Sequence, residues 1–270
     1  MKIFQNKTKI SANLKLAEGY FKFVLEAKQI ARSSLPGQFV MVDTGRQNKP
    51  LLRRPFSIHK VRGGKIEILY EVVGEGTKIL SQKKPGEDLD LIGPLGNGFK
   101  YKPSGNKAIL IAGGMGVAPL VFLAQELKSK RVLVLIGAKT KNRIICAKEF
   151  ANLGCDLKIA TDDGSAGFKG YVNDLLKNIL AASGKPQAAD IFGCGPKPML
   201  RDLSQISREF NIPAQVSLEA HMACGFGACL GCAVETQAGL KRACKEGPVF
   251  KADEIIWQGE KESGSIRKNR

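Results

Sequence analysis

The chain has 270 residues, 43% of them hydrophobic, and its 42 Lys and Arg residues against 25 Asp and Glu residues give a formal net charge of +17. This length predicts two domains plus a small appendage, with enough apolar residues to build their cores. The basic residues are scattered along all segments, which favours a solvated surface over a nucleic-acid or anionic-membrane site; steering of an acidic partner or a phosphorylated cofactor stays open.

Neither the N-terminal segment nor the most apolar stretch has the pattern of a targeting or membrane segment. The start, Met1 to Lys7, lacks the apolar core of a secretory signal. The most apolar stretch, Ile109 to Ala124, is too short for a comfortable membrane span and is interrupted by glycines. We therefore expect a cytoplasmic protein, in which thiols stay reduced.

Residues 1 to about 100 predict short strands separated by turns. Turn residues at Pro36-Gly37, Arg62-Gly63-Gly64 and Pro85-Gly86 break the apolar runs at short intervals. A small antiparallel barrel is the economical fold for such strands. The expected strands are 20–25, 38–42, 56–61 and 65–73, followed by a helical turn within 77–82.

A basic motif, Arg53-Arg54-Pro55-Phe56-Ser57, lies within this predicted barrel. A guanidinium can fork onto a pyrophosphate while the chain lies along a flavin ring, so the motif suits a flavin cofactor. A charged strand end without a ligand is the alternative.

The second half of the chain alternates strands with helices. After a Pro, Ser, Gly and Asn linker at 103–106, this order predicts a parallel sheet covered by helices on both faces. The expected strands are 108–112, 131–137, 156–161 and 189–194, and the expected helices are 119–129, 146–152, 171–181 and 197–210.

Two glycine turns follow strands of this predicted sheet. In the segment Ala112–Pro119, glycines between a strand and a helix would let a phosphate approach the backbone N–H groups, with Pro119 in the first helical turn. The segment Gly193–Met199 follows another strand, and the two turns can converge on one ligand crevice. Cys194 would then lie near the nicotinamide; a core cysteine and a bare strand–helix turn are the alternatives.

Four cysteines near the C-terminus have the spacing C-x4-C-x2-C-x11-C, which is typical of a plant-type [2Fe–2S] centre. The intervening glycines let a tight loop wrap a cluster and direct backbone N–H groups toward its sulfurs. Zinc usually takes two separated cysteine pairs, and seven cysteines is an odd number for a disulfide framework. The cluster ligands would be Cys224, Cys229, Cys232 and Cys244.

Together these motifs resemble the ferredoxin–NADP reductase superfamily, in which they occur in the same order. The segment from Ser217 to Cys232, continuing to Phe250, resembles the electron transfer subunits of class B dihydroorotate dehydrogenase. The resemblance covers nearly the whole chain. It implies a multi-domain β and α/β fold: an antiparallel FAD-binding β-barrel at 1–102, a doubly wound parallel nicotinamide-binding sheet at 103–216, a small [2Fe–2S] domain at 217–258 and a tail at 259–270.

The resemblance also assigns ligand contacts. The stretch 69–71 is assigned on local strand pattern, and Phe56 stands where the superfamily often has tyrosine, so this chain lacks that hydroxyl. The residues implied to contact FAD are Arg54, Pro55, Phe56, Ser57, Leu69, Tyr70, Glu71, Gly76 and Thr77, and those for the nicotinamide are Gly113, Gly114, Gly116, Cys194, Gly195 and Pro196.

The resemblance implies that electrons pass from an FMN-containing catalytic subunit through the cluster and FAD to NAD+, in pyrimidine biosynthesis and as a heterotetramer with two copies of each chain. Hydride transfer works largely by positioning, so no acid–base catalytic residue is expected. The two histidines, His59 and His221, have no spaced partner.

Two other functions use the same motifs. A free-standing NAD(P)H-dependent reductase for ferredoxin or an oxygenase has the same domains, and a zinc-stabilised nucleic-acid-binding protein is disfavoured by the paired glycine turns. The choice between NAD and NADP is open: no acidic residue follows the second parallel strand, and Lys139 or Arg143 could bind a 2′-phosphate, although the resemblance implies NAD.

Overall fold

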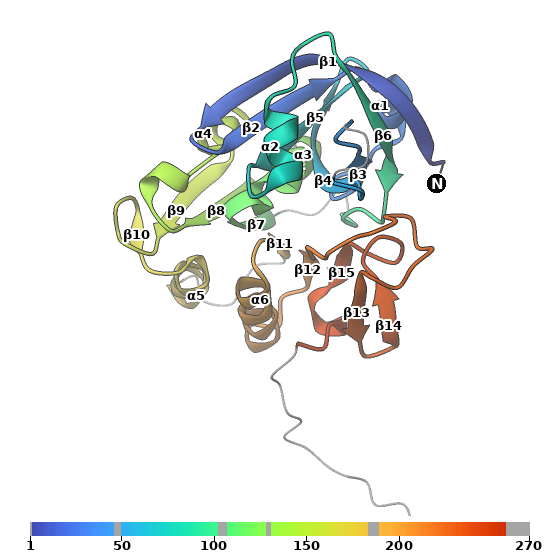
Figure 1. Ribbon diagram of the computed structural model, residues 1–270. Coiled ribbons are helices and arrows are strands. Elements are labelled where there is room, and N and C mark those ends of the chain that lie inside the picture. The colour runs from blue at the N-terminus through green and yellow to red at the C-terminus, as the bar shows by residue number, and fades with distance from the viewer. Residues whose placement is uncertain (1, 46–49, 102–106, 128–130, 183–188, 258–270) are drawn as a thin grey trace, which may run out of the picture.

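The computed structural model contains a barrel, a mostly parallel sheet flanked by helices, and a cysteine-rich segment beside the end of the barrel (Figure 1). It describes residues 2–45, 50–101, 107–127, 131–182 and 189–257. The predicted linker at 103–106 and the predicted tail at 259–270 lie outside the described residues. Within the described chain, no helix combines the length and the hydrophobicity needed to cross a membrane.

The predicted antiparallel barrel is confirmed. Six strands close on themselves in the order β1-β2-β5-β4-β3-β6, so no edge is left unpaired. The long first strand was not predicted, because polar residues fill most of it and few of its side chains are buried. The elements are β1 (Phe4–Ala17), β2 (Tyr20–Leu25), α1 (Lys28–Ser33), β3 (Phe39–Val42), β4 (Arg54–Arg62), β5 (Lys65–Glu71), α2 (Glu75–Ser81) and β6 (Asp88–Leu95).

The second unit is a seven-stranded sheet in the order β10-β9-β8-β7-β11-β12-β15. All neighbours are parallel except the last pair, which confirms the predicted parallel core of the sheet. Its elements are β7 (Lys107–Gly113), α3 (Val117–Glu126), β8 (Arg131–Ala138), α4 (Ala147–Asn152), β9 (Asp156–Thr161), β10 (Phe168–Lys169), α5 (Val172–Ala182), β11 (Asp190–Cys194), α6 (Lys197–Glu209) and β12 (Ala214–Ser217), with 3-10 turns η1 (Gly114–Gly116) and η2 (Lys141–Arg143).

Strand β7 shows why this sheet forms. Its side chains alternate between two aliphatic cores, with Leu110 and Ala112 on the face covered by α3 and α4, and Ile109 and Ile111 on the face covered by α5 and α6. Each fully buried aliphatic side chain contributes about 1.5–3 kcal/mol relative to exposure. The continuous apolar run in the sequence therefore corresponds to a strand that is buried on both faces.

The cysteine-rich segment adds a hairpin, β13 (Ala233–Thr236) and β14 (Gly239–Arg242), then β15 (Val249–Lys251) and a 3-10 turn, η3 (Ala252–Glu254). Strand β15 pairs antiparallel with β12 and so completes the large sheet. The boundary predicted after residue 216 falls inside β12. The cysteine-rich segment is thus joined to the second unit through the sheet itself.

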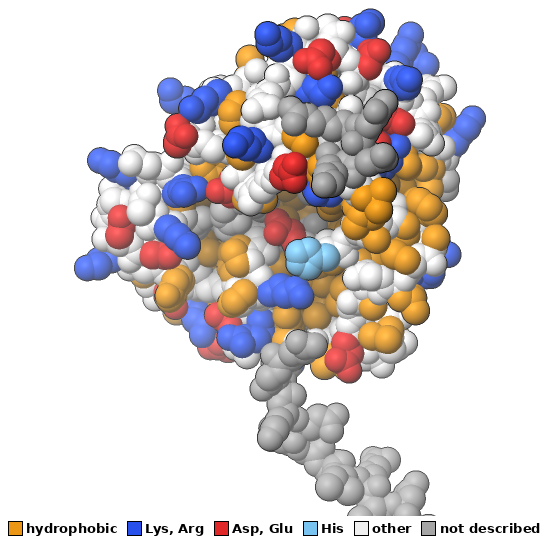
Figure 2. Space-filling view, viewed as in Figure 1, with side chains coloured by type: hydrophobic (Ala, Val, Ile, Leu, Met, Phe, Trp, Pro, Cys, Tyr) orange, Lys and Arg blue, Asp and Glu red, His pale blue; other side chains and the backbone are white. Residues whose placement is uncertain are grey.

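The barrel and the sheet meet through helix α3. Its Phe122 is buried within the barrel core, among residues such as Ile58 and Tyr70. A second contact joins the two units, where the ring of Phe99 meets that of Phe192 on β11 edge-on at 5.7 Å. On the face seen in Figure 2, basic and acidic side chains are interspersed, as the scattered charges in the sequence suggest.

Candidate functional site

The arginine of the predicted flavin motif lies against the start of helix α2. A Cβ on Gly76 would fall 2.8 Å from Arg54 Nε, so the backbone of this turn lies directly on the guanidinium. The Arg54 Nη1 donates to the carbonyl of Leu52 at 2.5 Å. The fold therefore brings two predicted flavin segments, far apart in sequence, to one place.

The hydroxyl of Thr77 is engaged within its own turn. It accepts hydrogen bonds from the backbone N–H groups of Val73, at 3.0 Å, and Gly74, at 3.2 Å, and it lies 3.1 Å from the Gly74 carbonyl, to which it can donate. These bonds order the loop from β5 into α2. The contact of Thr77 with FAD stays a prediction. In the structure, its hydroxyl bonds to the backbone of its own turn.

The stretch 69–71 alternates its side chains as a strand must. The Tyr70 ring lies in the barrel core, stacked on Phe23 at 5.0 Å, and its hydroxyl donates to Asn13 Oδ1 at 3.0 Å. Burial raises the pKa of this tyrosine. A contact of Tyr70 with FAD would thus have to come from its main chain, whereas Leu69 and Glu71 point to the other side of the strand.

The two glycine turns touch each other. A Cβ on Gly116 would fall 2.0 Å from the carbonyl oxygen of Cys194, and a Cβ on Gly113 would fall 2.8 Å from Pro196 Cδ. Strands β7 and β11 are neighbours in the sheet, with Ala112 paired to Cys194, which is why both turns leave the same edge. This proximity is what the predicted shared crevice needs, and only glycine permits it.

The Cys194 side chain is buried, and burial, together with the nearby charge of Glu219, raises its pKa. A hydrogen bond with Ser217 acts in the opposite direction but does not offset burial. The sulfur is therefore a protonated thiol at neutral pH. Its nearness to a nicotinamide stays a prediction, and the part of Cys194 that contacts Gly116 is its main chain.

The four predicted cluster cysteines form two pairs. Cys224 Sγ and Cys229 Sγ lie 3.4 Å apart, and the Cys244 backbone N–H is 3.5 Å from Cys232 Sγ. In the part of the chain that the structure describes, the only metal-type group whose ligand atoms all lie within 4.8 Å is His59, Cys146 and Glu149.

Among the described residues, no three of the four cluster sulfurs therefore lie within 4.8 Å of one another. One tetrahedral zinc ion would place all four of them about 3.8 Å apart, at about 2.3 Å from the metal. One close sulfur pair, Cys224 and Cys229, with Cys232 and Cys244 beside each other, suits two irons instead. The donor set thus fits a binuclear iron–sulfur cluster and does not fit the zinc alternative.

The backbone of the loop around Cys224 stabilises a thiolate at that residue. Burial alone would raise the pKa of Cys224, but the backbone N–H groups of Cys229, Phe226 and Ala228 donate toward the sulfur and lower the pKa to about 6. Burial and the neighbouring sulfurs raise the pKa of Cys244 to about 12. The crowded sulfurs therefore need positive charge among them, which a pair of irons would supply.

Arg242 fastens the cluster loop to its hairpin. Its Nη1 donates to the Gly227 carbonyl at 2.7 Å, and its guanidinium pairs with Glu246 at 2.6 Å. The loop also lies against the barrel: a Cβ on Gly225, where φ is +81°, would fall 2.4 Å from Met41 Cγ. Met41 is paired in the sheet with Pro55 of the predicted flavin motif. The cluster loop and that motif are therefore separated by a single strand.

No sequence pattern pointed to Met41, to Arg242 or to the acidic pair Asp162 and Asp163 just after β9. The Asp162 N–H donates to the Ala138 carbonyl at 3.1 Å, so Asp162 and Asp163 lie beside the end of β8, where doubly wound folds bind the ribose. Asp162 and Asp163 follow β9 in the sequence, so the residues that come directly after β8 do not include them. Arg143, considered above for a 2′-phosphate, instead donates to Glu71 at 2.9 Å and Tyr20 at 3.0 Å on the barrel.

Two family models match this chain. Residues 219–256 match the iron–sulfur cluster binding domain of dihydroorotate dehydrogenase B, and residues 110–205 match an oxidoreductase NAD-binding domain. These ranges contain the cysteine loop and the two glycine turns, respectively.

Curated relatives match over nearly their whole length. The chain is 45% identical to the dihydroorotate dehydrogenase B (NAD(+)) electron transfer subunit of Desulforamulus reducens, covering 93% of this chain and 97% of that protein. It is 40% identical to the subunit of the same name from Clostridium acetobutylicum, covering 92% and 96%.

Solved structures agree with the fold. The chain from a study of flavin-based electron bifurcation in NADH-dependent reduced ferredoxin-NADP oxidoreductase is 31% identical, with a TM-score of 0.83 over 93% of this chain and 90% of that one. The ferredoxin reductase in carbazole 1,9a-dioxygenase, at 20% identity and a TM-score of 0.67 over 79% and 68%, shows the fold alone.

Proposed function

The chain belongs to the family of electron transfer subunits of dihydroorotate dehydrogenase B, and from this premise we propose that it carries electrons from a catalytic flavoprotein subunit to NAD+. The path uses a [2Fe–2S] cluster and FAD. It supports oxidation of dihydroorotate to orotate in pyrimidine biosynthesis. The catalytic subunit would carry FMN, and the assembly would contain two copies of each chain.

One observation carries this proposal. The cluster loop rests on Met41 of β3, and Met41 is paired with Pro55 in the predicted flavin strand β4. A single intervening strand keeps the predicted cluster loop and the predicted flavin motif close together. The chain thus has the short internal connection that electron transfer needs.

The residues around these groups suit binding and orientation. Arg54, beside Gly76, can pair with a pyrophosphate, and the touching turns at Gly113–Gly116 and Cys194–Pro196 offer backbone N–H groups to a second one. When bound, FAD exchanges a hydride with the nicotinamide and single electrons with the cluster. No acid–base side chain is needed at this site, in line with the sequence.

We infer NAD as the nicotinamide. Asp162 and Asp163 follow β9 and lie beside the end of β8, so their carboxylates can accept from ribose hydroxyls and would repel a 2′-phosphate. Arg143 is held on the barrel by Glu71, which leaves it badly placed to attract that phosphate. Lys139 remains as a basic side chain of this turn. We expect a clear preference for NADH over NADPH in flavin reduction.

The cluster loop also offers a surface for the partner. Phe226 and Leu230 flank the ligand cysteines and are exposed, at 49% and 69%. Exposed apolar side chains next to a redox centre suit a protein partner better than water. We also propose a cytoplasmic location, supported by seven cysteines that are all free in the structure.

The test is reconstitution. This chain and a catalytic FMN-containing dihydroorotate dehydrogenase subunit are co-expressed, co-purified and assayed for NAD-linked orotate formation, with the catalytic subunit alone as the control. We expect a stable complex whose NAD-linked activity requires this chain. Activity indifferent to its presence would rule the function out, and reduction of ferredoxin by the isolated chain at full rate would favour a free-standing reductase.

A further inference from the structure

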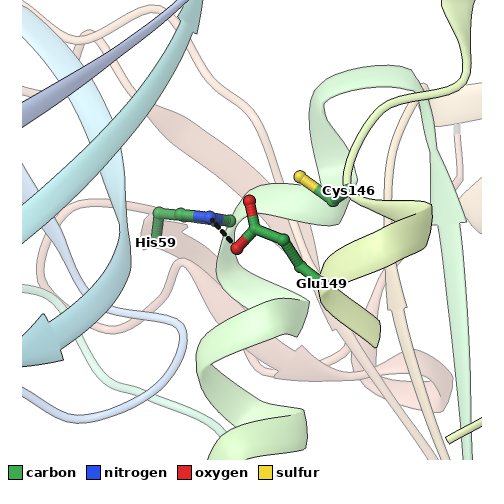
Figure 3. Close-up of side chains that lie close together, drawn as sticks. All are labelled: His59, Cys146 and Glu149. Atoms are coloured by element: carbon green, nitrogen blue, oxygen red, sulfur yellow. Dashed lines mark hydrogen bonds and ion pairs between the residues drawn. The ribbon is translucent and has the colours of Figure 1, made fainter. Parts of the chain in front are cut away.

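A buried histidine joins the barrel to the nicotinamide-binding sheet. His59 lies on β4, two residues after Ser57, and is 0% exposed. Its Nδ1 is 3.1 Å from the carbonyl oxygen of Ala118 in the first turn of α3, and its Nε2 is 3.2 Å from Glu149 Oε2 on α4. Figure 3 shows the ring directed edge-on toward the Glu149 carboxylate. One imidazole thus contacts two helices of the neighbouring unit.

Both partners of the ring are acceptors. A carbonyl cannot donate, and neither can an ionised carboxylate. Burial alone would raise the pKa of Glu149, but the hydrogen bond and charge of His59 and the ammonium groups of Lys60 and Lys22 hold it well below its usual range. The carboxyl is therefore ionised, and each ring nitrogen of His59 faces an acceptor on a different helix.

The same group of side chains does not suit a metal. Cys146 Sγ lies within 4.8 Å of the ligand atoms of His59 and Glu149, a separation that a metal ion could bridge. However, burial raises the pKa of Cys146 to about 12, so its thiol keeps its proton. Lys60 and Lys22 already pair with Glu149. These cations occupy the carboxylate that a metal would need.

We propose that His59 is a positioning residue for hydride transfer, holding the flavin strand at a fixed distance from the nicotinamide loop. This inference rests on the proposed function. Ala118 follows Gly116 of the glycine turn by two residues, just as His59 follows Ser57 of the flavin motif. The imidazole is therefore a direct link between the two segments that hold the reacting partners.

Other contacts also hold the barrel and the sheet together, so His59 is not needed to attach one to the other. Its role is to fix their relative position. Phe122 of α3 is inserted into the barrel core, and Arg143 pairs with Glu71 across the same boundary. The Phe122 contact is apolar and permits small sliding. Two hydrogen bonds to the rigid His59 ring instead set the position of β4 relative to α3 and α4. A displacement of about 1 Å between reacting groups can reduce a rate by about 100-fold.

The experiment compares the holo chain with His59→Gln, Glu149→Gln and the double variant. In stopped flow at saturating NADH, we expect the rate of flavin reduction to fall about 10- to 100-fold in His59→Gln, with the NADH dissociation constant, the FAD content and the reduced-cluster signal unchanged. Hydrogen exchange of the amides at 117–122 should be faster in both single variants. The double variant should lose less than the product of the single losses.

A matched control separates positioning from stability. Leu176→Ala removes a fully buried side chain on the opposite face of the sheet, and we expect it to lower the melting temperature at least as much as His59→Gln while leaving flavin reduction unchanged. Equal slowing in this control would overturn the inference. Glu149→Gln changes a residue of α4 and leaves the flavin strand itself unaltered, so it serves as the deciding variant should His59→Gln lose FAD.

The outcomes also separate this inference from the proposed function. Fast flavin reduction in the wild type and in both single variants would overturn the positioning role only. A wild-type chain that binds FAD and NADH yet transfers no hydride between them would overturn the proposed function and this inference with it.

Discussion

The nicotinamide-binding sheet and the cluster segment are stabilised by different means. The sheet buries aliphatic side chains on both faces, such as Ile109 and Leu110 of β7. The cluster segment adds a short hairpin, and its core against the barrel includes the ligands Cys232 and Cys244 themselves. A unit whose core contains its own metal ligands depends on the metal for its folded state, whereas an aliphatic core does not.

Removal of one ligand should have the largest effect and should break the cluster segment alone. In Cys244→Ala, we expect loss of iron, sulfide and NAD-linked orotate formation, while FAD stays bound and NADH still reduces it, because the sheet and the barrel do not need the cluster. Metal analysis and stopped flow provide the measurement. Cys155→Ala, at a half-buried cysteine without ligand spacing, is the control and should keep its iron. Retention of a full cluster by Cys244→Ala would contradict the assignment.

A substitution in the aliphatic core should instead destabilise the sheet and leave the cluster intact. Ile111 is fully buried, and Ile111→Ala should lower the free energy of unfolding by about 2–5 kcal/mol. The cluster spectrum per iron should not change. The matched substitution in the other region is Leu240→Ala, since Leu240 is 72% exposed on the cluster hairpin, and it should change stability by no more than about 0.5 kcal/mol. Denaturant unfolding followed by circular dichroism checks both, and similar losses in the two variants would argue against the contrast.

A smaller effect is expected where the two glycine turns touch. Gly116→Ala places a methyl group 2.0 Å from the Cys194 carbonyl oxygen, so the turns must separate. We expect NAD binding to weaken roughly 10- to 100-fold, with the cluster intact. Gly74→Ala, where a Cβ would meet nothing within 4 Å, is the control. Calorimetric titration that finds the same NAD affinity in both variants would exclude a shared crevice at this contact.

The smallest of the four predicted effects is a loss of stability in acid at the junction between the barrel and the sheet, where Glu149 contacts His59. Because the pKa of Glu149 is lowered in the folded state, its stabilisation is complete above its unfolded pKa, about 4.3, and is lost as pH falls through the folded pKa. Glu149→Gln should therefore show a flatter loss of melting temperature below about pH 4 than the wild type. Parallel acid profiles in the two proteins would show that the carboxylate does not contribute.

Much of the fold follows from local pattern. The unbroken apolar run at 108–112 and the helix at 197–210 were predicted within a few residues of β7 and α6. Strand β1 and the hairpin β13–β14 were missed, because their side chains are mostly polar or exposed and give little periodic signal. Strand β15 could not be predicted to join the large sheet, since its partner Val216 belongs to a segment that precedes the cluster loop.

Residue spacing alone predicts the cluster loop, the glycine turns and the flavin motif, because each is a short stretch whose pattern can be seen without knowing what it packs against. What these stretches contact is visible only in the folded chain: Met41 lies against Gly225, the Cys194 carbonyl against Gly116, and Glu149 beside His59, 90 residues away. Such contacts depend on how distant strands and helices pack. No local spacing encodes that packing, and it brings the predicted cluster loop and the predicted flavin motif to neighbouring strands.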